Sequence, residues 1–135
     1  MKKLARYLEV IVDPTFDEFH VNRGSFRHAY LACVAIFHSV DRAAEEMNEQ
    51  PKHLRQIWCM ESLQFRLVDI LAHHLKHVQS SDEKRPAKDG CIPIARAFGF
   101  DESGEAFDLR NLYYEIRDAV RFVHRKAGTC HPNLP

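Results

Sequence analysis

Arg117 and His124 are seven positions apart near the end of the 135-residue chain, in a segment whose apolar residues have helical spacing. Seven residues complete nearly two helical turns, so both side chains project from one face, about 10.5 Å apart along the axis. Arg121 lies between them on that face. A guanidinium stabilises negative charge on a phosphate, and an imidazole transfers protons near neutral pH. These residue types are suited to chemistry on RNA.

The pattern of an arginine, a polar residue, five further residues and a histidine resembles the motif of the HEPN (higher eukaryotes and prokaryotes nucleotide-binding) family. Here the pattern is Arg117-Asp118 followed by His124. The segment from Arg27 to His38 also resembles the aromatic, alanine-rich helix that these domains place early in their bundle. The resemblance covers residues 25–126. It implies a small all-α domain, often dimeric. Many members are metal-independent endoribonucleases of toxin, phage-defence or RNA-processing systems.

The resemblance also implies roles for the motif. His124 would be the general base or acid when a ribose 2′-hydroxyl attacks the adjacent phosphate, Arg117 would stabilise the pentacoordinate charge, and Asp118 would orient one of the two. The products would carry a 2′,3′-cyclic phosphate, with no metal or other cofactor. Two subunits would join their motifs across a two-fold axis, which predicts a homodimer. This interpretation requires Arg117 and His124 to be partly exposed and to line a cleft.

Three further side chains are candidates for binding RNA or a nucleotide. Arg121 shares the face of the motif. One of Tyr113 and Tyr114 must point away from the core; we take Tyr114 as the residue that could stack on a base, and packing in the core or an interface is the alternative. His38 could face Arg117 from its own helix, and its alternative role is that of a hydrogen-bonded, half-buried residue.

Two alternatives to a nuclease remain open. The first is structural: the arginines and His124 form a solvated face on which Asp118 pairs with Arg121 or Arg125. The second is functional: the protein is a non-catalytic helical dimer that acts as an antitoxin, an adaptor or a regulatory partner. Such a protein needs only the bundle and its apolar faces. A cognate toxin or antitoxin is the protein partner that these interpretations imply.

Three histidines form the second cluster of chemically useful residues. His73 and His77 have i, i+4 spacing, and His74 and His77 have i, i+3 spacing, so either pair could share a metal ion on a helix. No glutamate follows His73 as a zinc protease requires, and the Glu-x-x-His pattern of di-iron bundles is absent. We therefore predict no metal site and interpret the cluster as a surface feature near a helix end, with a metal-binding bundle centred on these three histidines as the weaker alternative.

The elements that must position these residues are helices. Apolar residues make up 45% of the chain, it has only 5 glycines, and no segment alternates apolar and polar residues as a strand would. Ser25 is a good N-cap, Pro51 suits a first helical turn, Asp13-Pro14 should end the first helix, and Gly128 should end the last. Four long helices are predicted, over residues 2–12, 25–48, 51–78 and 105–126. The sequence thus predicts an all-α, antiparallel bundle of four to five helices, HEPN-like in architecture.

Along the chain we expect an N-terminal helix and connection over residues 1–24, the bundle over 25–127, and a frayed tail over 128–135. Residues 79–90 are predicted to form an exposed loop, and residues 91–100 to add a turn of helix.

Charge and hydropathy exclude two classes of function. Lysines and arginines balance aspartates and glutamates at 19 each, which argues against binding of long duplex DNA by bulk electrostatics. The longest uncharged apolar stretch, Ala29 to Phe37, is too short to cross a bilayer, so no membrane association is predicted. The four cysteines contain no Cys-x-x-Cys pair and are interpreted as reduced thiols of a cytoplasmic protein.

Overall fold

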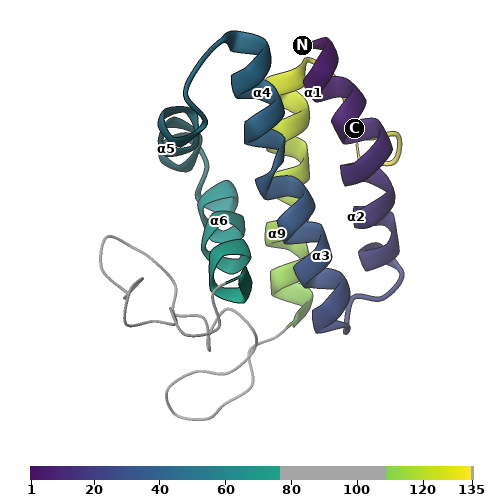
Figure 1. The fold of residues 1–135 in the computed structure, drawn as a ribbon. Coiled ribbons are helices and arrows are strands. Elements are labelled where there is room, and N and C mark those ends of the chain that lie inside the picture. The colour runs from purple at the N-terminus through teal and green to yellow at the C-terminus, as the bar shows by residue number, and fades with distance from the viewer. Residues whose placement is uncertain (77–108, 135) are drawn as a thin grey trace.

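Amphipathic segments of the sequence form helices that pack their apolar stripes together, as shown in Figure 1. The computed structural model describes residues 1–76 and 109–134; the segments for which a loop (79–90) and a turn of helix (91–100) are predicted lie outside them. Within these two ranges the chain is all-α and has no β-strand. The elements are α1 (Lys2–Tyr7), the π-helix η1 (Leu8–Val12), α2 (Asp13–His20), α3 (Phe26–Phe37), α4 (Ser39–Met47), α5 (Pro51–Glu61), α6 (Leu63–Lys76) and α9 (Leu109–Ala127).

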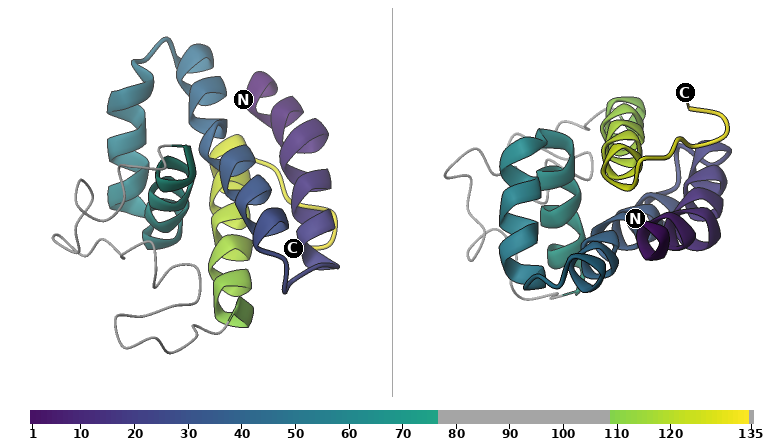
Figure 2. Two further views of the ribbon diagram at one scale, coloured as in Figure 1. Left: turned by 60° about the horizontal axis from the view of Figure 1, so that its bottom comes forward. Right: turned by 90° about the horizontal axis from the view of Figure 1, so that it is seen from above.

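Helix α9 is the central element of the bundle. It packs against α6 on one side and against α3, α1 and α2 on the other, and Figure 2 shows this arrangement from two further directions. It runs antiparallel to α6 and α2, as the colour gradient of Figure 1 shows. The apolar stripe predicted for this helix is buried where its side chains are described, at Leu112, Ile116, Val120 and Val123. The bundle is therefore closed by the last helix of the chain.

The first helix does not end at Asp13-Pro14, contrary to the prediction. Elements α1, η1 and α2 follow one another without a break up to His20. In η1 the N–H of Asp13 bonds to the carbonyl of Leu8, five residues back. This wider turn precedes Pro14, whose ring would clash with the preceding turn of a regular α-helix. Leu4, Leu8, Val12, Phe16 and Phe19 all enter the core, so the N-terminal segment is part of the bundle.

The second and third predicted helices are each divided in two. The helix that Ser25 caps, through the N–H of His28, ends at Phe37, and α4 continues from Ser39. Between α5 and α6 the chain is extended at Ser62 (φ −139°, ψ 116°). The hydroxyl of Ser62 accepts a hydrogen bond from the N–H of Phe65 at 3.0 Å. Serine thus starts a new helix there, which apolar periodicity alone does not reveal.

The C-terminal tail packs on the bundle and is not frayed, contrary to the expectation. Gly128 ends α9 in the left-handed conformation (φ +74°), as predicted, and the N–H of Thr129 bonds to the carbonyl of His124 at 3.0 Å. The chain then folds back along α2, where His131 is buried. In the described part of the chain no helix combines the length and the hydropathy needed to span a membrane.

Candidate functional site

Arg117, Asp118 and Arg121 form an ion-pair cluster on the outer face of α9. The carboxylate of Asp118 accepts hydrogen bonds from Arg117 (3.1 Å) and from Arg121 (3.0 Å). The guanidinium of Arg117 also lies over the ring of Tyr114, 4.8 Å from its centre. Tyr114 is exposed, whereas Tyr113 is buried and hydrogen-bonds His20 through its hydroxyl. The pairing of Asp118 with Arg121 is the one that the structural alternative expected, but the two arginine side chains are only partly exposed and His124 does not share this face.

His124 is separated from this cluster because it turns into the bundle. Only 4% of it is exposed. Its Nε2–H donates to the carboxylate of Asp13 on α2 at 2.7 Å, and its Nδ1 is 2.8 Å from the hydroxyl oxygen of Thr129. His124 therefore does not have the exposure that the HEPN-like interpretation requires. To transfer a proton to a substrate, it would first have to give up one of these partners. The catalytic assignment of Arg117, Asp118 and His124 stays a prediction.

A second aspartate–histidine contact lies beside the first. Nε2–H of His131 donates to the carboxylate of Asp17 at 2.9 Å, while its Nδ1 accepts from the backbone N–H of Asn133 at 3.0 Å. Asp13 and Asp17 are one turn apart on α2, so the two contacts form parallel rungs between α2 and the C-terminal end of the chain. With both nitrogens of each ring in use, these histidines hold structure together.

A different group of polar side chains surrounds a hollow between α3, α4, α5 and α6. Its volume is about 290 Å³, at the lower end of the range for small-molecule sites. Apolar side chains form part of the wall, and four ionisable groups and a tyrosine complete it. The lining residues are Tyr30, Val34, Phe37, His38, Asp41, Arg55, Ala72 and His73. This hollow, which we call the histidine pocket, contains His38, the one predicted substrate-binding residue that lies apart from α9.

Both histidines of the pocket are held through Nδ1, His38 by the carboxylate of Asp41 and His73 by the backbone carbonyl of Asp69. Nδ1–H of His38 donates to the carboxylate of Asp41 at 2.9 Å. Nδ1–H of His73 donates to the backbone carbonyl of Asp69 at 2.9 Å and lies 3.1 Å from its carboxylate. Within residues 1–76 and 109–134, Nε2 of neither ring has a hydrogen-bond partner. An imidazole held at Nδ1 with Nε2 available has the arrangement of a general acid or base.

Phe37 contacts both imidazoles, and Arg55 lies over the ring of Phe37. The ring of Phe37 makes edge contacts with His38 and with His73, each with ring centres 5.0 Å apart. The guanidinium of Arg55, on α5, lies 5.9 Å above the same phenyl ring and 3.8 Å from the carboxylate of Asp69. Arg55 thus lines the pocket from a third helix. Two oriented imidazoles and one cation are the groups that acid–base chemistry on a phosphodiester requires.

A cysteine behind the pocket is held in its protonated form. Burial, with a further contribution from the charge of Asp69, raises the pKa of Cys59 to about 12. Its thiol is therefore a poor nucleophile at neutral pH. Burial also raises the pKa of Cys33 above its ordinary range. Neither thiol is suited to covalent catalysis.

The three-histidine cluster is described at one member only. His73 belongs to the pocket, while the side chain of His74 and the whole of His77 lie outside the described residues. Among the side chains that are described, no three histidines, cysteines, aspartates or glutamates are grouped so that they could hold a metal ion.

Comparison with known proteins identifies no relative. No protein-family model matches the chain, and neither the curated proteins nor the solved structures contain a match.

Sequence reasoning named His38 and His73 for other roles and missed Asp41, Asp69 and Arg55. The spacings His38–Asp41 (i, i+3) and Asp69–His73 (i, i+4) are visible in the sequence as helical pairs. Those spacings could have identified both pairs. The sequence does not show that the two pairs line one pocket with Arg55, because this depends on the packing of four helices.

Proposed function

We propose that this protein is a metal-independent ribonuclease whose acid–base groups are His38 and His73. The observation that carries the proposal is that both imidazoles line one pocket together with Arg55, and that each is held at Nδ1, His38 by the carboxylate of Asp41 and His73 by the backbone carbonyl of Asp69. We thus propose the reaction class that the sequence predicted, with different residues as its acid–base groups.

In the proposed reaction, one imidazole is neutral and takes the proton of a ribose 2′-hydroxyl at Nε2. The 2′-oxygen then forms a bond to phosphorus, and the bond from phosphorus to the 5′-oxygen breaks. The second imidazole, which begins charged, gives its proton to that leaving oxygen. The products are a 2′,3′-cyclic phosphate and a free 5′-hydroxyl. Arg55 would neutralise the charge on the pentacoordinate phosphorus, and Asp41 and Asp69 are positioning residues.

The proposal predicts loss of RNA cleavage in pocket variants. With a labelled single-stranded RNA and a chelator present, His38→Ala and His73→Ala should each lower kcat/KM by about 100-fold or more, the usual contribution of a general acid or base. The wild-type rate should have a bell-shaped dependence on pH, because one imidazole must be neutral while the other is charged. The matched control is His53→Ala on α5, because the side chain of His53 is exposed and lies outside the pocket. This variant should cleave RNA as fast as wild type does.

Two results would contradict this assignment. Cleavage that survives in both pocket variants but is lost in Arg117→Ala would transfer the reaction to α9, in agreement with the HEPN-like prediction. Absence of any cleavage by wild type would favour the non-catalytic alternative.

One observation supports that alternative: Met60 is 88% exposed, and Leu63 beside it is also exposed, at the junction of α5 and α6. Exposed methionine and leucine are typical of surfaces that bind a protein partner.

A further inference from the structure

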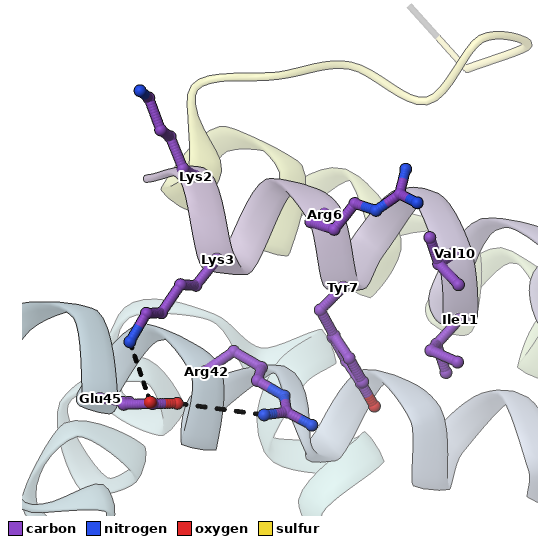
Figure 3. A pocket seen from close by; sticks show the side chains of 8 residues that line it. All are labelled: Lys2, Lys3, Arg6, Tyr7, Val10, Ile11, Arg42 and Glu45. Atoms are coloured by element: carbon purple, nitrogen blue, oxygen red, sulfur yellow. Dashed lines mark hydrogen bonds and ion pairs between the residues drawn. The ribbon is translucent and has the colours of Figure 1, made fainter.

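A basic groove lies along α4, the helix that also contributes Asp41 to the histidine pocket. It runs between α1–η1 and α4, has a volume of about 570 Å³, and is shown in Figure 3. The lining residues are Lys2, Lys3, Arg6, Tyr7, Val10, Ile11, Arg42 and Glu45. Neither the sequence patterns nor the proposed reaction accounts for this groove.

Cations dominate the groove although the whole chain is formally neutral. Among the residues that the structure describes, Glu45 is the one carboxylate that lines it, against four lysines and arginines. Glu45 pairs with Lys3 at 2.9 Å and more distantly with Arg42 at 3.9 Å. Arg6 pairs with an acid outside the groove, and both partners are largely exposed. The side chain of Lys2 has no ion pair or hydrogen bond with any described residue. The surplus of positive charge favours a ligand that carries phosphates.

An apolar strip runs beside these cations. Val10 and Ile11 are 46% and 42% exposed, and both belong to the π-helix η1. In Figure 3 they follow Tyr7 and Arg6 along the wall of the groove. The hydroxyl of Tyr7 donates to the carbonyl of Ala35 at 2.7 Å, so its ring is fixed in place. An apolar strip next to cations suits a ligand with alternating phosphates and flat or apolar groups, such as a nucleic acid single strand.

Helix α4 connects the groove with the histidine pocket. Asp41, three residues after His38, orients that histidine and lines the pocket. The next residue in the sequence, Arg42, lines the groove. Charges from the groove and from the pocket both act on Tyr7. Burial raises the pKa of Tyr7 to about 12, while the charge of Arg42 in the groove acts to lower this pKa and the charge of Asp41 in the pocket acts to raise it. A ligand in the groove therefore lies next to the helix that carries Asp41 and begins just after His38.

We propose that the basic groove binds the sugar–phosphate backbone of a single-stranded RNA substrate beyond the nucleotides held in the histidine pocket. This inference rests on the proposed function for the identity of the substrate. It assigns Arg6 and Arg42 as phosphate-binding residues and makes the protein selective for RNA longer than a dinucleotide.

The test measures binding separately from cleavage. The probe is a fluorescent single-stranded oligonucleotide of about 12 nucleotides, within the usual range of site sizes, made with 2′-O-methyl riboses so that it resists cleavage. Fluorescence anisotropy should show that Arg6→Gln/Arg42→Gln raises Kd by about tenfold at low salt. The slope of log affinity against log salt should also become shallower by about 1 to 2. Arg27→Gln is the matched control, because Arg27 is exposed on α3 and lines neither the groove nor the pocket.

The outcomes separate this inference from the proposed function. Equal affinity of the double variant and wild type for the oligonucleotide would overturn the subsite, even if the histidine pocket cleaves RNA. Groove-dependent binding without cleavage by wild type would support the subsite and overturn the ribonuclease. The chief competing ligand is an anionic membrane surface. If the double variant loses binding to phosphatidylserine vesicles while its RNA affinity is unchanged, the groove is a lipid site and the inference is wrong.

Discussion

The aspartate–histidine contacts divide into two kinds according to what the second ring nitrogen does. In the histidine pocket, His38 and His73 use only Nδ1 among the described residues. At the C-terminal end of the chain, His124 and His131 use both nitrogens and are almost fully buried. Under the proposed function, the same residue pair would orient a reactive group in one place, and it stabilises the fold in the other. Solvent exposure of the imidazole separates the two roles.

At this scale the buried contact between Asp13 and His124 predicts a stability change. Replacing His124 with alanine removes the hydrogen-bond partner of a buried carboxylate and leaves a space in the core. We expect the free energy of unfolding to fall by about 2 to 3 kcal/mol. Urea unfolding followed by circular dichroism measures this quantity. The exposed His53→Ala should change it by less than about 0.5 kcal/mol.

A double-mutant cycle with Asp13→Ala isolates the contact. If the two residues interact as the structure shows, the effects of the two substitutions should not add, and their coupling should be about 1 kcal/mol or more. Additive effects would mean that the hydrogen bond contributes nothing to stability.

At the scale of elements, two carboxylates of α4 bind the first turn of α1. Its first turn contains no acidic residue, and Glu46 of α4 serves instead by accepting hydrogen bonds from the backbone N–H groups of Lys3 (3.1 Å) and Leu4 (3.2 Å). Glu45 adds an ion pair with Lys3. The start of α1 is therefore capped by a different helix, and the basic groove exists only while these contacts hold.

These carboxylates make the docking of α1 dependent on pH. The hydrogen bond from Lys3 holds the pKa of Glu45 below its ordinary value of 4.5. Partial burial acts to raise the pKa of Glu46, but the backbone N–H donors outweigh it, so this pKa also lies below 4.5. A lowered folded-state pKa gives stabilisation that is present above pH 4.5 and is lost as the pH falls through the folded-state value.

We therefore expect the free energy of unfolding to decrease below pH 4.5 less steeply in the double variant Glu45→Gln/Glu46→Gln than in wild type. Urea titrations at a series of acidic pH values measure the slope. The control is Glu49→Gln, which removes an exposed carboxylate just after α4. If wild type and the double variant have the same slope, the two carboxylates do not hold α1 in place.

For the molecule as a whole, the C-terminal tail joins the two ends of the chain. The N-terminal ammonium of Met1 is 3.4 Å from the carbonyl of Ala127, and His131 packs edge-on against Phe16 with ring centres 5.8 Å apart. The two aspartate–histidine rungs lie between these points. Residues at both ends of the sequence thus contribute to one closed interface with α2.

Removal of the tail after Gly128 should loosen this interface. Phe16 and His124 would be exposed, so we expect a loss of about 2 kcal/mol in the free energy of unfolding. Amide hydrogen exchange should become faster in α2 than in α6, because α6 lies on the opposite side of α9. The exposed Pro132→Ala should leave both quantities near wild type. If hydrogen exchange becomes faster to the same extent in α2 and in α6, the tail does not stabilise α2 locally.

Local patterns in the sequence were enough for the all-α class, for the cap at Ser25, for Pro51 in a first turn and for the stop at Gly128. Each of these depends on the spacing of apolar residues or on the conformational preference of one residue, and both are local properties. The breaks at His38 and Ser62 and the passage through Pro14 were not predictable in this way. They depend on how each turn fits against its neighbours in the bundle.

Only the tertiary structure decided which histidines are available for chemistry. Spacing along α9 placed Arg117 and His124 on one face, which is correct for the backbone. The docking of α2 then covers His124 with Asp13, a residue 111 positions away in the sequence. His38, His73 and Arg55 line one pocket because α3, α4, α5 and α6 pack together. Helical periodicity does not predict which residues of different helices come together. The sequence by itself therefore determined the helical class and the apolar faces, and long-range packing decided where the helices break and which side chains meet in the histidine pocket.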